Sequence, residues 1–499
     1  MTDVESFSIV ILLVAAALMV AVLSKRLSER TRVPAAALFL VAAAVASDIF
    51  PVLGTVPLVV DERVVTVALV FILFDGGMHI GWRRFRSAAG AISWIGIAGT
   101  AVTAAALAVL AHALFGFDWR TALLIGAALS PTDPAVVFSV LGGREVSGRT
   151  GVILEGESGA NDPVGIALMV SLLGASGGGF AAVAGGVGEF VLQMVVGAVV
   201  GVLGGYGLVK LMRRVGLPDE SLHSVRTIAC AAFIYAAASL LQGSGFLAVF
   251  LAGIVVGDAR APYKREIERF TAGIASICEI VVFAVLGLSI SLRDVLASGE
   301  LWVGLALAGL LILVVRPVLV GLLLWTIRLN PGERAFILWA GLKGAVPILL
   351  GMFILSSGAP RATQVYSIIF IVVLVSVVVQ GGLVPLFATL FKVPMRRVEQ
   401  TPWSLDLRFR QEPKGMHRHV VGAGSPADGC TIADLALGEA GWISMIRRDG
   451  HLVQVRGSTE LRAGDTVLTL SESDTWPGEL FEAPTGKGGS GTSPHPPVS

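Results

Sequence analysis

Apolar windows of membrane-spanning length recur along almost the whole chain. About 20 apolar residues are needed to cross the hydrocarbon layer of a bilayer, and such windows follow one another from residue 6 to about residue 391. Charged residues make up only 15% of the chain, whereas ordinary globular chains carry about 25%. Mean hydropathy is +0.81. We therefore predict an all-α, multi-pass membrane protein that sits in the lipid bilayer.

About thirteen spans are expected, two of them short. They are 6–24, 33–50, 62–80, 88–115, 119–141, 150–173, 180–210, 225–241, 245–258, 270–290, 300–327, 334–356 and 363–391. Lys and Arg gather in alternate loops, as in Arg83-Arg84 and Arg213-Arg214, while the loops between are poor in both. Basic loops face the cytoplasm. The pattern predicts an outside N-terminus and a cytoplasmic C-terminus in the plasma (inner) membrane.

The chain changes character after the last span. We predict a transmembrane domain over residues 1–395, a small cytosolic α+β domain over 400–480 and a disordered tail over 484–499. Short β-like runs occur at 443–446, 453–455 and 467–470, and the tail has too little apolar content for a core. Net charge is +1, so a global basic field for nucleic acid is absent and no nucleic-acid partner is expected.

Several ionisable residues lie at membrane depth. The run 153–163 reads ILEGESGANDP and places Glu155, Glu157 and Asp162 within one apolar window. A charge at the bilayer centre costs about 3 kcal/mol on insertion scales, so such residues persist where they line a wet cavity, pair or bind an ion. Five further groups of this kind are Asp75, Asp133, Glu279, Arg316 and Lys343. Each alone could be a structural ion-pair partner; together, with both signs present, they favour an ion pathway. His79 and His112 lie near span ends, where a surface or interfacial histidine is the simpler interpretation.

Two spans carry helix-breaking residues at corresponding positions. Ser-Pro-Thr-Asp-Pro occupies 130–134, and Gly-Leu-Lys-Gly-Ala-Val-Pro occupies 341–347. Proline removes a backbone donor, and freed backbone groups in a membrane survive only where they line a cavity or are otherwise satisfied. Matched interruptions indicate an inverted-repeat transporter with two crossed, broken helices. Asp133 and Lys343 are placed to offset the partial charges of the half-helix ends.

Spacing assigns geometry to the acidic run. Glu155, Ser158 and Asp162 fall near one helix face, and Ser158 with Asp162 can offer oxygens to a hard monovalent cation. Buried Glu157 needs a cationic partner, for which Lys343 and Arg316 are the deep candidates. A single carboxylate that holds either a proton or a cation is a minimal exchanger. The role of Glu155 stays open.

The segments 130–134, 155–163 and 341–347 resemble those of the NhaP-type cation/proton antiporters, relatives of the animal sodium/proton exchangers. The resemblance implies that Asp162 exchanges cation and proton, with Ser158, Thr132 and Asp133 beside the monovalent cation. It implies a Glu–basic pair of Glu157 with Lys343, and a further core cation at Arg316. Asn161 in place of an acid implies electroneutral, one-for-one exchange, and the family implies a homodimer.

Residues 425–470 resemble the C-terminal lobe of regulator-of-potassium-conductance domains (RCK-C, or TrkA-C-like). Such lobes accompany potassium transport more than sodium transport and bind small molecules or nucleotides, so the resemblance implies a ligand of this kind at the lobe. No cofactor is expected. Val421-Gly422-Ala423-Gly424 is interpreted as a turn rather than a dinucleotide-binding loop.

These features favour a secondary antiporter that exchanges K⁺ for H⁺ by alternating access and serves pH homeostasis. The first alternative is Na⁺(Li⁺)/H⁺ exchange at the same residues, because selectivity depends on cavity geometry that a sequence does not reveal. The second is a ligand-gated channel, against which stands the lack of a carbonyl-lined filter motif such as Thr-Val-Gly-Tyr-Gly. An enzyme is not expected, since no His/Cys metal-ligand spacing or nucleophile elbow appears, and Gly156-Glu157-Ser158-Gly159 lacks the Gly-x-Ser-x-Gly spacing.

Overall fold

The computed structural model describes residues 19, 34–50, 53, 56–141, 144–146, 148–174, 180–297, 299–397, 416–435, 441–449, 451–471 and 480–482. Contacts between Cα atoms divide the chain into two compact units, Met1–Gln400 and Thr401–Ser499. Apart from residue 19, the predicted first span lies outside the described residues, as does the predicted tail over 484–499.

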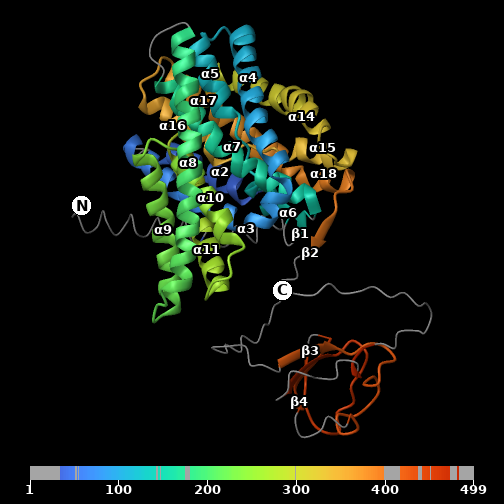
Figure 1. Ribbon diagram of the computed structural model, residues 1–499. Coiled ribbons are helices and arrows are strands. Elements are labelled where there is room, and N and C mark those ends of the chain that lie inside the picture. The colour runs from blue at the N-terminus through green and yellow to red at the C-terminus, as the bar shows by residue number, and fades with distance from the viewer. Residues whose placement is uncertain are drawn as a thin grey trace. The chain divides into compact units, whose positions relative to one another are not determined.

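The first unit is a bundle of helices (Figure 1). Its α-helices are α2 Ala35–Ile49, α3 Leu58–Ser93, α4 Thr100–Phe115, α5 Trp119–Leu129, α6 Ala135–Leu141, α7 Gly148–Gly174, α8 Phe180–Arg214, α9 Glu220–Leu240, α10 Gly245–Gly257, α11 Lys264–Leu288, α12 Leu292–Ala297, α13 Glu300–Leu310, α14 Gly321–Trp325, α15 Pro331–Trp339, α16 Ala345–Ser356, α17 Ala362–Val375 and α18 Val384–Leu390. Three π-helical segments continue them, η2 Trp94–Gly99, η3 Leu311–Val320 and η4 Ser376–Gln380.

Each predicted span from 33–50 onward coincides with one or more of these helices. Among the described residues, six helical stretches are long and apolar enough to cross a membrane, and α2, α5, α10 and α16 are shorter apolar helices. The longest stretch, Leu58–Phe115, bends at Gly81, whose φ of +67° is left-handed, so it supplies two of the predicted spans. The total number of spans stays a prediction.

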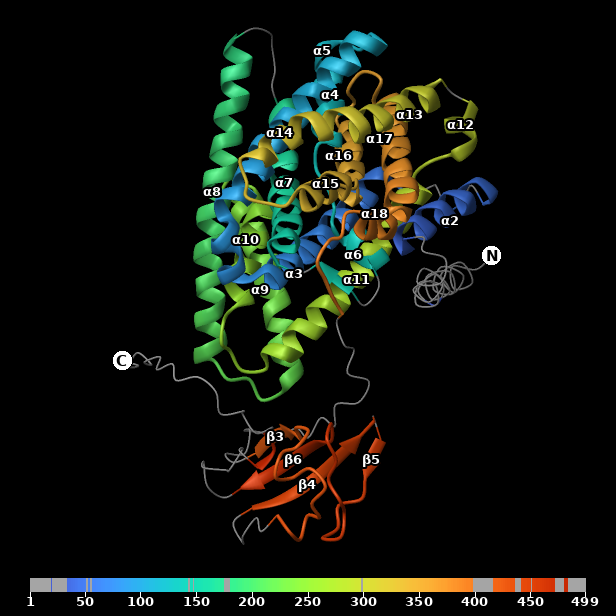
Figure 2. The same ribbon diagram turned by 90° about the vertical axis from the view of Figure 1, so that its right-hand side faces the viewer.

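Close helix packing surrounds the middle of this unit. Figure 2 shows α7 inside the bundle, and α10 packs against both α3 and α8. Short strands β1 Arg144–Val146 and β2 Met395–Arg397 pair antiparallel, with Arg144 opposite Arg397. This pairing, which the sequence did not predict, joins the segment after α6 to the end of the helical unit.

The second unit contains a four-stranded antiparallel sheet. Its strands are β3 Met416–Val420, β4 Gly441–Arg448, β5 His451–Val453 and β6 Thr466–Ser471, in the order β3-β6-β4-β5. Ile446, Leu461 and Val467 are buried in its core. β4 and β6 contain the predicted β-like runs at 443–446 and 467–470, β5 overlaps the run at 453–455 only at Val453, and β3 was missed. Among residues 416–435, 441–449, 451–471 and 480–482, strands and turns are found but no α-helix. The segment Val421–Gly424 is a turn, as predicted, with Gly424 at φ +74°.

Candidate functional site

The two interrupted helices meet at their breaks. Residues 130–134 separate α5 from α6, and residues 340–344 separate α15 from α16. The N–H of Asp133 donates to the carbonyl of Leu342 at 2.8 Å. Gly344 accommodates the Asp133 carboxylate, because a Cβ there would lie 1.9 Å from Asp133 Oδ2. The breaks therefore form one crossing, held by backbone contact.

The side chain of Lys343 lies at the C-terminal end of α5, the first half of the first interrupted helix. Its Nζ donates to the carbonyls of Ser130 at 3.0 Å and Pro131 at 2.9 Å, and its side chain is 1% exposed. A helix C-terminus carries a partial negative charge and unpaired carbonyls, which a cation satisfies. This position matches the offsetting role predicted from the sequence.

Arg316 satisfies backbone carbonyls at the end of α15, the first half of the second interrupted helix. It also pairs with Glu157. Its Nε donates to the Leu338 carbonyl at 2.9 Å and its Nη2 to Glu157 Oε1 at 2.9 Å. The implied pairing of Glu157 with Lys343 is therefore wrong. The planar guanidinium can serve a carbonyl and a carboxylate at once, whereas the Lys343 ammonium is taken up by Ser130 and Pro131. The π-helical η3, which contains Pro317, carries Arg316.

Asn161 ties α7 to the first break. Its Nδ2 donates to Thr132 Oγ1 at 2.7 Å, and its Oδ1 accepts from the Thr132 N–H at 3.3 Å. Asn161 and Thr132 are both buried. The amide thus replaces helical partners that Thr132 lacks in the non-helical segment, so Asn161 supports the break as well as standing beside Asp162.

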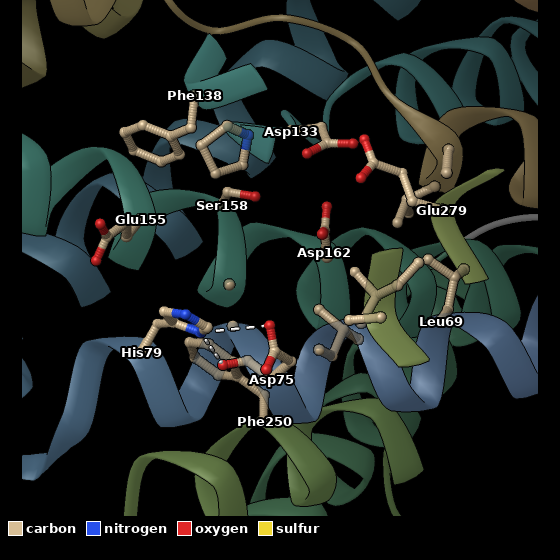
Figure 3. Close-up of a pocket in the computed structure, with 18 of the residues that line it drawn as sticks. Leu69, Asp75, His79, Asp133, Phe138, Glu155, Ser158, Asp162, Phe250 and Glu279 are labelled. Carbon is tan, nitrogen blue, oxygen red and sulfur yellow. Dashed lines mark hydrogen bonds and ion pairs between the residues drawn. The ribbon is translucent and has the colours of Figure 1, made fainter. Parts of the chain in front are cut away.

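A cavity of about 510 Å³ opens beside this crossing. Figure 3 shows Asp162 and Ser158 pointing into it from α7, with Asp133, Glu279 and Asp75 around them. Its polar lining residues are Asp75, His79, Asp133, Glu155, Ser158, Asp162, Ser276 and Glu279. Glu155, Ser158 and Asp162 line the same cavity, as their spacing predicts. Thr132 is not among the lining residues, and its side chain is engaged by Asn161.

Asp162 has an oxygen available for a ligand. Its side chain is buried, and Oδ1 has no hydrogen-bond partner among the described residues. A buried carboxylate oxygen without a partner is costly, so the Asp162 carboxylate is expected to hold a proton or a cation. Ser158 and Asp133 supply further oxygens in the same cavity. Hard cations prefer such oxygen ligands, so the arrangement can bind a cation or a proton at Asp162.

Three groups in and around the site were missed from the sequence. His79 lies in the cavity wall rather than at a plain interface. Ser376 and Gln380 on η4 are each 1% exposed and hold the second break. Ser376 Oγ accepts from the Lys343 N–H at 2.9 Å, and Gln380 bonds to both Ser376 and the Trp339 carbonyl. Polar residues in an apolar span were the available signal. Glu155 pairs with Arg84 of α3 at 3.5 Å.

Family models match both units of the chain. The sodium/hydrogen exchanger transmembrane family matches residues 14–390, and the TrkA-C domain matches residues 416–475. The chain belongs to the sodium/hydrogen exchanger family. It is a multi-pass membrane transporter, a monovalent cation/proton antiporter, with a C-terminal TrkA-C domain.

Curated relatives cover most of this antiporter. It is 31% identical over 473 residues to the K(+)/H(+) antiporter NhaP of Alkalimonas amylolytica, covering 93% of this chain and 82% of that protein. It is 33% identical over 486 residues to the K(+)/H(+) antiporter NhaP2 of Shewanella oneidensis, with coverages of 94% and 82%. The Na(+)/H(+) antiporter NhaP of Pseudomonas aeruginosa is 28% identical, with coverages of 64% and 79%.

A solved structure shares the fold. The sodium proton antiporter MjNhaP1 from Methanocaldococcus jannaschii at pH 8 superposes with a TM-score of 0.65 at 20% identity, covering 77% of this chain and 98% of that one. The predicted fold class, an all-α multi-pass membrane protein with a small C-terminal α+β domain, is confirmed for the helical unit and for the presence of the small domain, whose described residues contain a sheet but no α-helix.

Proposed function

We propose that this antiporter exchanges K⁺ for H⁺ across the plasma membrane by alternating access, with the two ions competing for Asp162. The observation that carries the proposal is the buried Asp162 carboxylate, whose Oδ1 has no hydrogen-bond partner within the described part of the chain. It faces a cavity that also contains Ser158 and Asp133. Because one carboxylate cannot hold both ions, binding of one releases the other.

Exchange is one-for-one and electroneutral in this proposal. Asn161, next to Asp162, does not titrate, and both ends of its amide are engaged by Thr132. Lys343 already serves two backbone carbonyls, so it is committed to structure. Asp162 is then the residue that gives up one proton for each cation.

We propose K⁺ rather than Na⁺ as the transported cation for two reasons. The relatives that cover most of this chain are named K(+)/H(+) antiporters, and the C-terminal TrkA-C domain is of a kind associated with potassium transport. Na⁺ or Li⁺ exchange at the same residues is the second candidate, favoured by the relative named a Na(+)/H(+) antiporter.

We further propose a homodimer, as the resemblance implies, with the N-terminus outside and the TrkA-C domain in the cytoplasm, where it can take a small-molecule or nucleotide ligand. The alternating basic loops support this orientation. The residues of α3 that line the cavity run from Leu69 to His79, and Arg83 and Arg84 of that basic series follow shortly after them in the sequence. The cavity therefore opens toward the cytoplasm in this proposal.

The test is cation-driven dissipation of a pH gradient in everted membrane vesicles. Asp162→Asn is expected to abolish it, while Glu189→Gln, which changes an exposed carboxylate on α8 that bonds Gln193, should leave it intact. Retained exchange in Asp162→Asn would contradict the proposal. Parallel assays with K⁺, Na⁺ and Li⁺ assign the cation, and Asn161→Asp, if it folds, should make exchange sensitive to membrane potential.

A further inference from the structure

His79 stands in the wall of the ion cavity, one turn after Asp75 on α3. Its side chain is 61% exposed, and Figure 3 shows it below Glu155, with its ring directed toward Asp75. The chemistry assigned to Asp162 does not require it. An exposed histidine beside carboxylates in a proton-exchanging cavity is a group that can itself take a proton.

Hydrogen bonding fixes which ring nitrogen accepts that proton. Nδ1 lies 3.0 Å from the Asp75 carbonyl oxygen and 3.3 Å from Asp75 Oδ2. Both neighbours are acceptors, so the neutral ring carries its hydrogen on Nδ1. Nε2 is then the basic nitrogen. Protonation at Nε2 converts the hydrogen bond to Asp75 into an ion pair without moving the ring.

Charged groups surround His79 from several elements. On its own helix these are Asp75 and Arg84, whose Nη1 donates to the His79 carbonyl at 3.2 Å. Glu155 and Asp162 face the cavity from α7, Asp133 from the first break and Glu279 from α11. The lining residues from α10 and α16 are apolar. Arg84 is shared with Glu155, so Asp75 is the carboxylate that His79 neutralises directly.

We propose that His79 is a proton-controlled positioning residue of this antiporter: protonated at Nε2, it holds Asp75 as an ion pair and so weakens the attraction of the cavity for the transported cation. Asp75 is suited to this because Oδ1 is buried without a hydrogen-bond partner among the described residues, which leaves its charge directed at the cavity unless His79 is charged. The proton on His79 is not carried across. It sets how strongly the cation competes for Asp162.

The sign of the effect follows directly. As pH falls, His79 gains charge and cation affinity drops, in addition to the direct competition at Asp162. This inference rests on the proposed function, because it presupposes the exchange at Asp162. One competing proton raises the apparent KM for the cation by at most about tenfold per pH unit, and a second coupled proton makes the dependence steeper. The antiporter would then slow more steeply as pH falls through the range in which His79 takes its proton.

The experiment compares the pH dependence of the apparent KM for K⁺ in full-length His79→Gln, His79→Lys and wild-type protein in everted vesicles. His79→Gln should show a shallower dependence with kcat unchanged at alkaline pH. His79→Lys, a permanent cation, should raise KM by about threefold to tenfold at alkaline pH and show the same shallow dependence. His112→Gln is the matched control, because His112 Nδ1 also bonds a carbonyl, that of Phe117, and His112 is not among the cavity-lining residues.

A wild-type pH dependence of KM in His79→Gln would overturn the inference, as would an unchanged KM in His79→Lys. Asp162→Asn is assayed in the same set. Exchange that survives in Asp162→Asn refutes the proposed function, whereas an inactive Asp162→Asn together with an unaltered His79→Gln refutes the role of His79 alone. Since His79 is exposed, its substitution should leave protein amount in the membrane unchanged, which immunoblotting checks.

Discussion

The interrupted helices α5–α6 and α15–α16 both begin with a capping side chain and end their first half in carbonyls at membrane depth. Asp118 accepts from the Thr121 N–H at the start of α5, and the Asn330 N–H donates to Glu333 at the start of α15. Lys343 serves the end of α5 and Arg316 the end of α15. The cations differ in origin: Lys343 comes from the other break, whereas Arg316 comes from η3.

This difference separates their roles. The first break places Asp133 and Pro134 in the cavity wall, so neighbouring side chains do not fully enclose this break. The second is enclosed by Ser376, Gln380 and Arg316, and the residues just after it, Ala345 and Val346, give the cavity an apolar surface. We call the second break the brace, because other side chains enclose it, whereas the first break borders the cavity. Four substitutions test this division, from the largest expected effect to the smallest.

Lys343→Met should have the largest effect, because it leaves the Ser130 and Pro131 carbonyls unsatisfied beside the cavity. Each hydrogen bond from a charged donor contributes about 1.5–3 kcal/mol, so exchange should fall by about a hundredfold or more at equal protein amount. Vesicle assays of the pH gradient measure it. Exchange close to wild type would show that the first break does not depend on the second.

Arg316→Met should act on stability. Removing one partner of a buried ion pair costs about 3–5 kcal/mol, and here the Leu338 carbonyl also loses its donor. The thermal unfolding midpoint in detergent should drop further than in Glu157→Gln, which leaves that carbonyl bond in place. Equal drops in both variants would mean that Arg316 acts only through Glu157 and does not brace α15.

Ser376→Ala should destabilise the brace by about 1–3 kcal/mol, the cost of leaving the buried Lys343 N–H without an acceptor. Ser171→Ala on α7 is the matched control: Ser171 is equally buried, but its Oγ has no hydrogen-bond partner within the described residues. The same unfolding measurement compares the two. If Ser171→Ala lowered the free energy of unfolding as much as Ser376→Ala does, the hydrogen bond from Lys343 to Ser376 would not be a specific part of the brace.

Asp118→Ala should have the smallest effect, about 1 kcal/mol, typical of a lost N-cap. The hydrogen bond from the Thr121 N–H keeps the pKa of Asp118 below its usual value. A carboxylate whose pKa is lowered by folding stabilises the fold above its usual pKa and loses this contribution as pH falls through the folded value. Acid should therefore lower hydrogen-exchange protection at the start of α5 in the wild type but not in Asp118→Ala, which has no carboxylate there to protonate. Equal acid-dependent loss in both proteins would contradict this.

Local sequence could predict the breaks but not the partners that satisfy them. Pro131, Pro134 and Pro347, with the glycines around Lys343, mark where helices must stop, and the spacing of Glu155, Ser158 and Asp162 fixes their common face. The partner of Glu157 depends on how η3 is wound around Pro317, and the position of His79 depends on the bend at Gly81 and on the packing of α3 against α7. Those are tertiary properties, which helical periodicity does not encode. The strand β3 was missed because Met416–Val420 alternates two histidines with other residues rather than showing an apolar run.

The bond from Lys343 to the Pro131 carbonyl spans 212 residues of sequence. The ribosome therefore synthesises α5, and the insertion machinery receives this helix, long before Lys343 has been synthesised. Until then the Pro131 carbonyl lacks its donor. During that interval the first break must be tolerated by water, lipid headgroups or a chaperone. Folding of this protein should therefore include a late step in which Lys343, from the second half of the chain, supplies the hydrogen bonds that the first break lacks. Chains truncated before residue 343 should be recognised by quality control as incomplete.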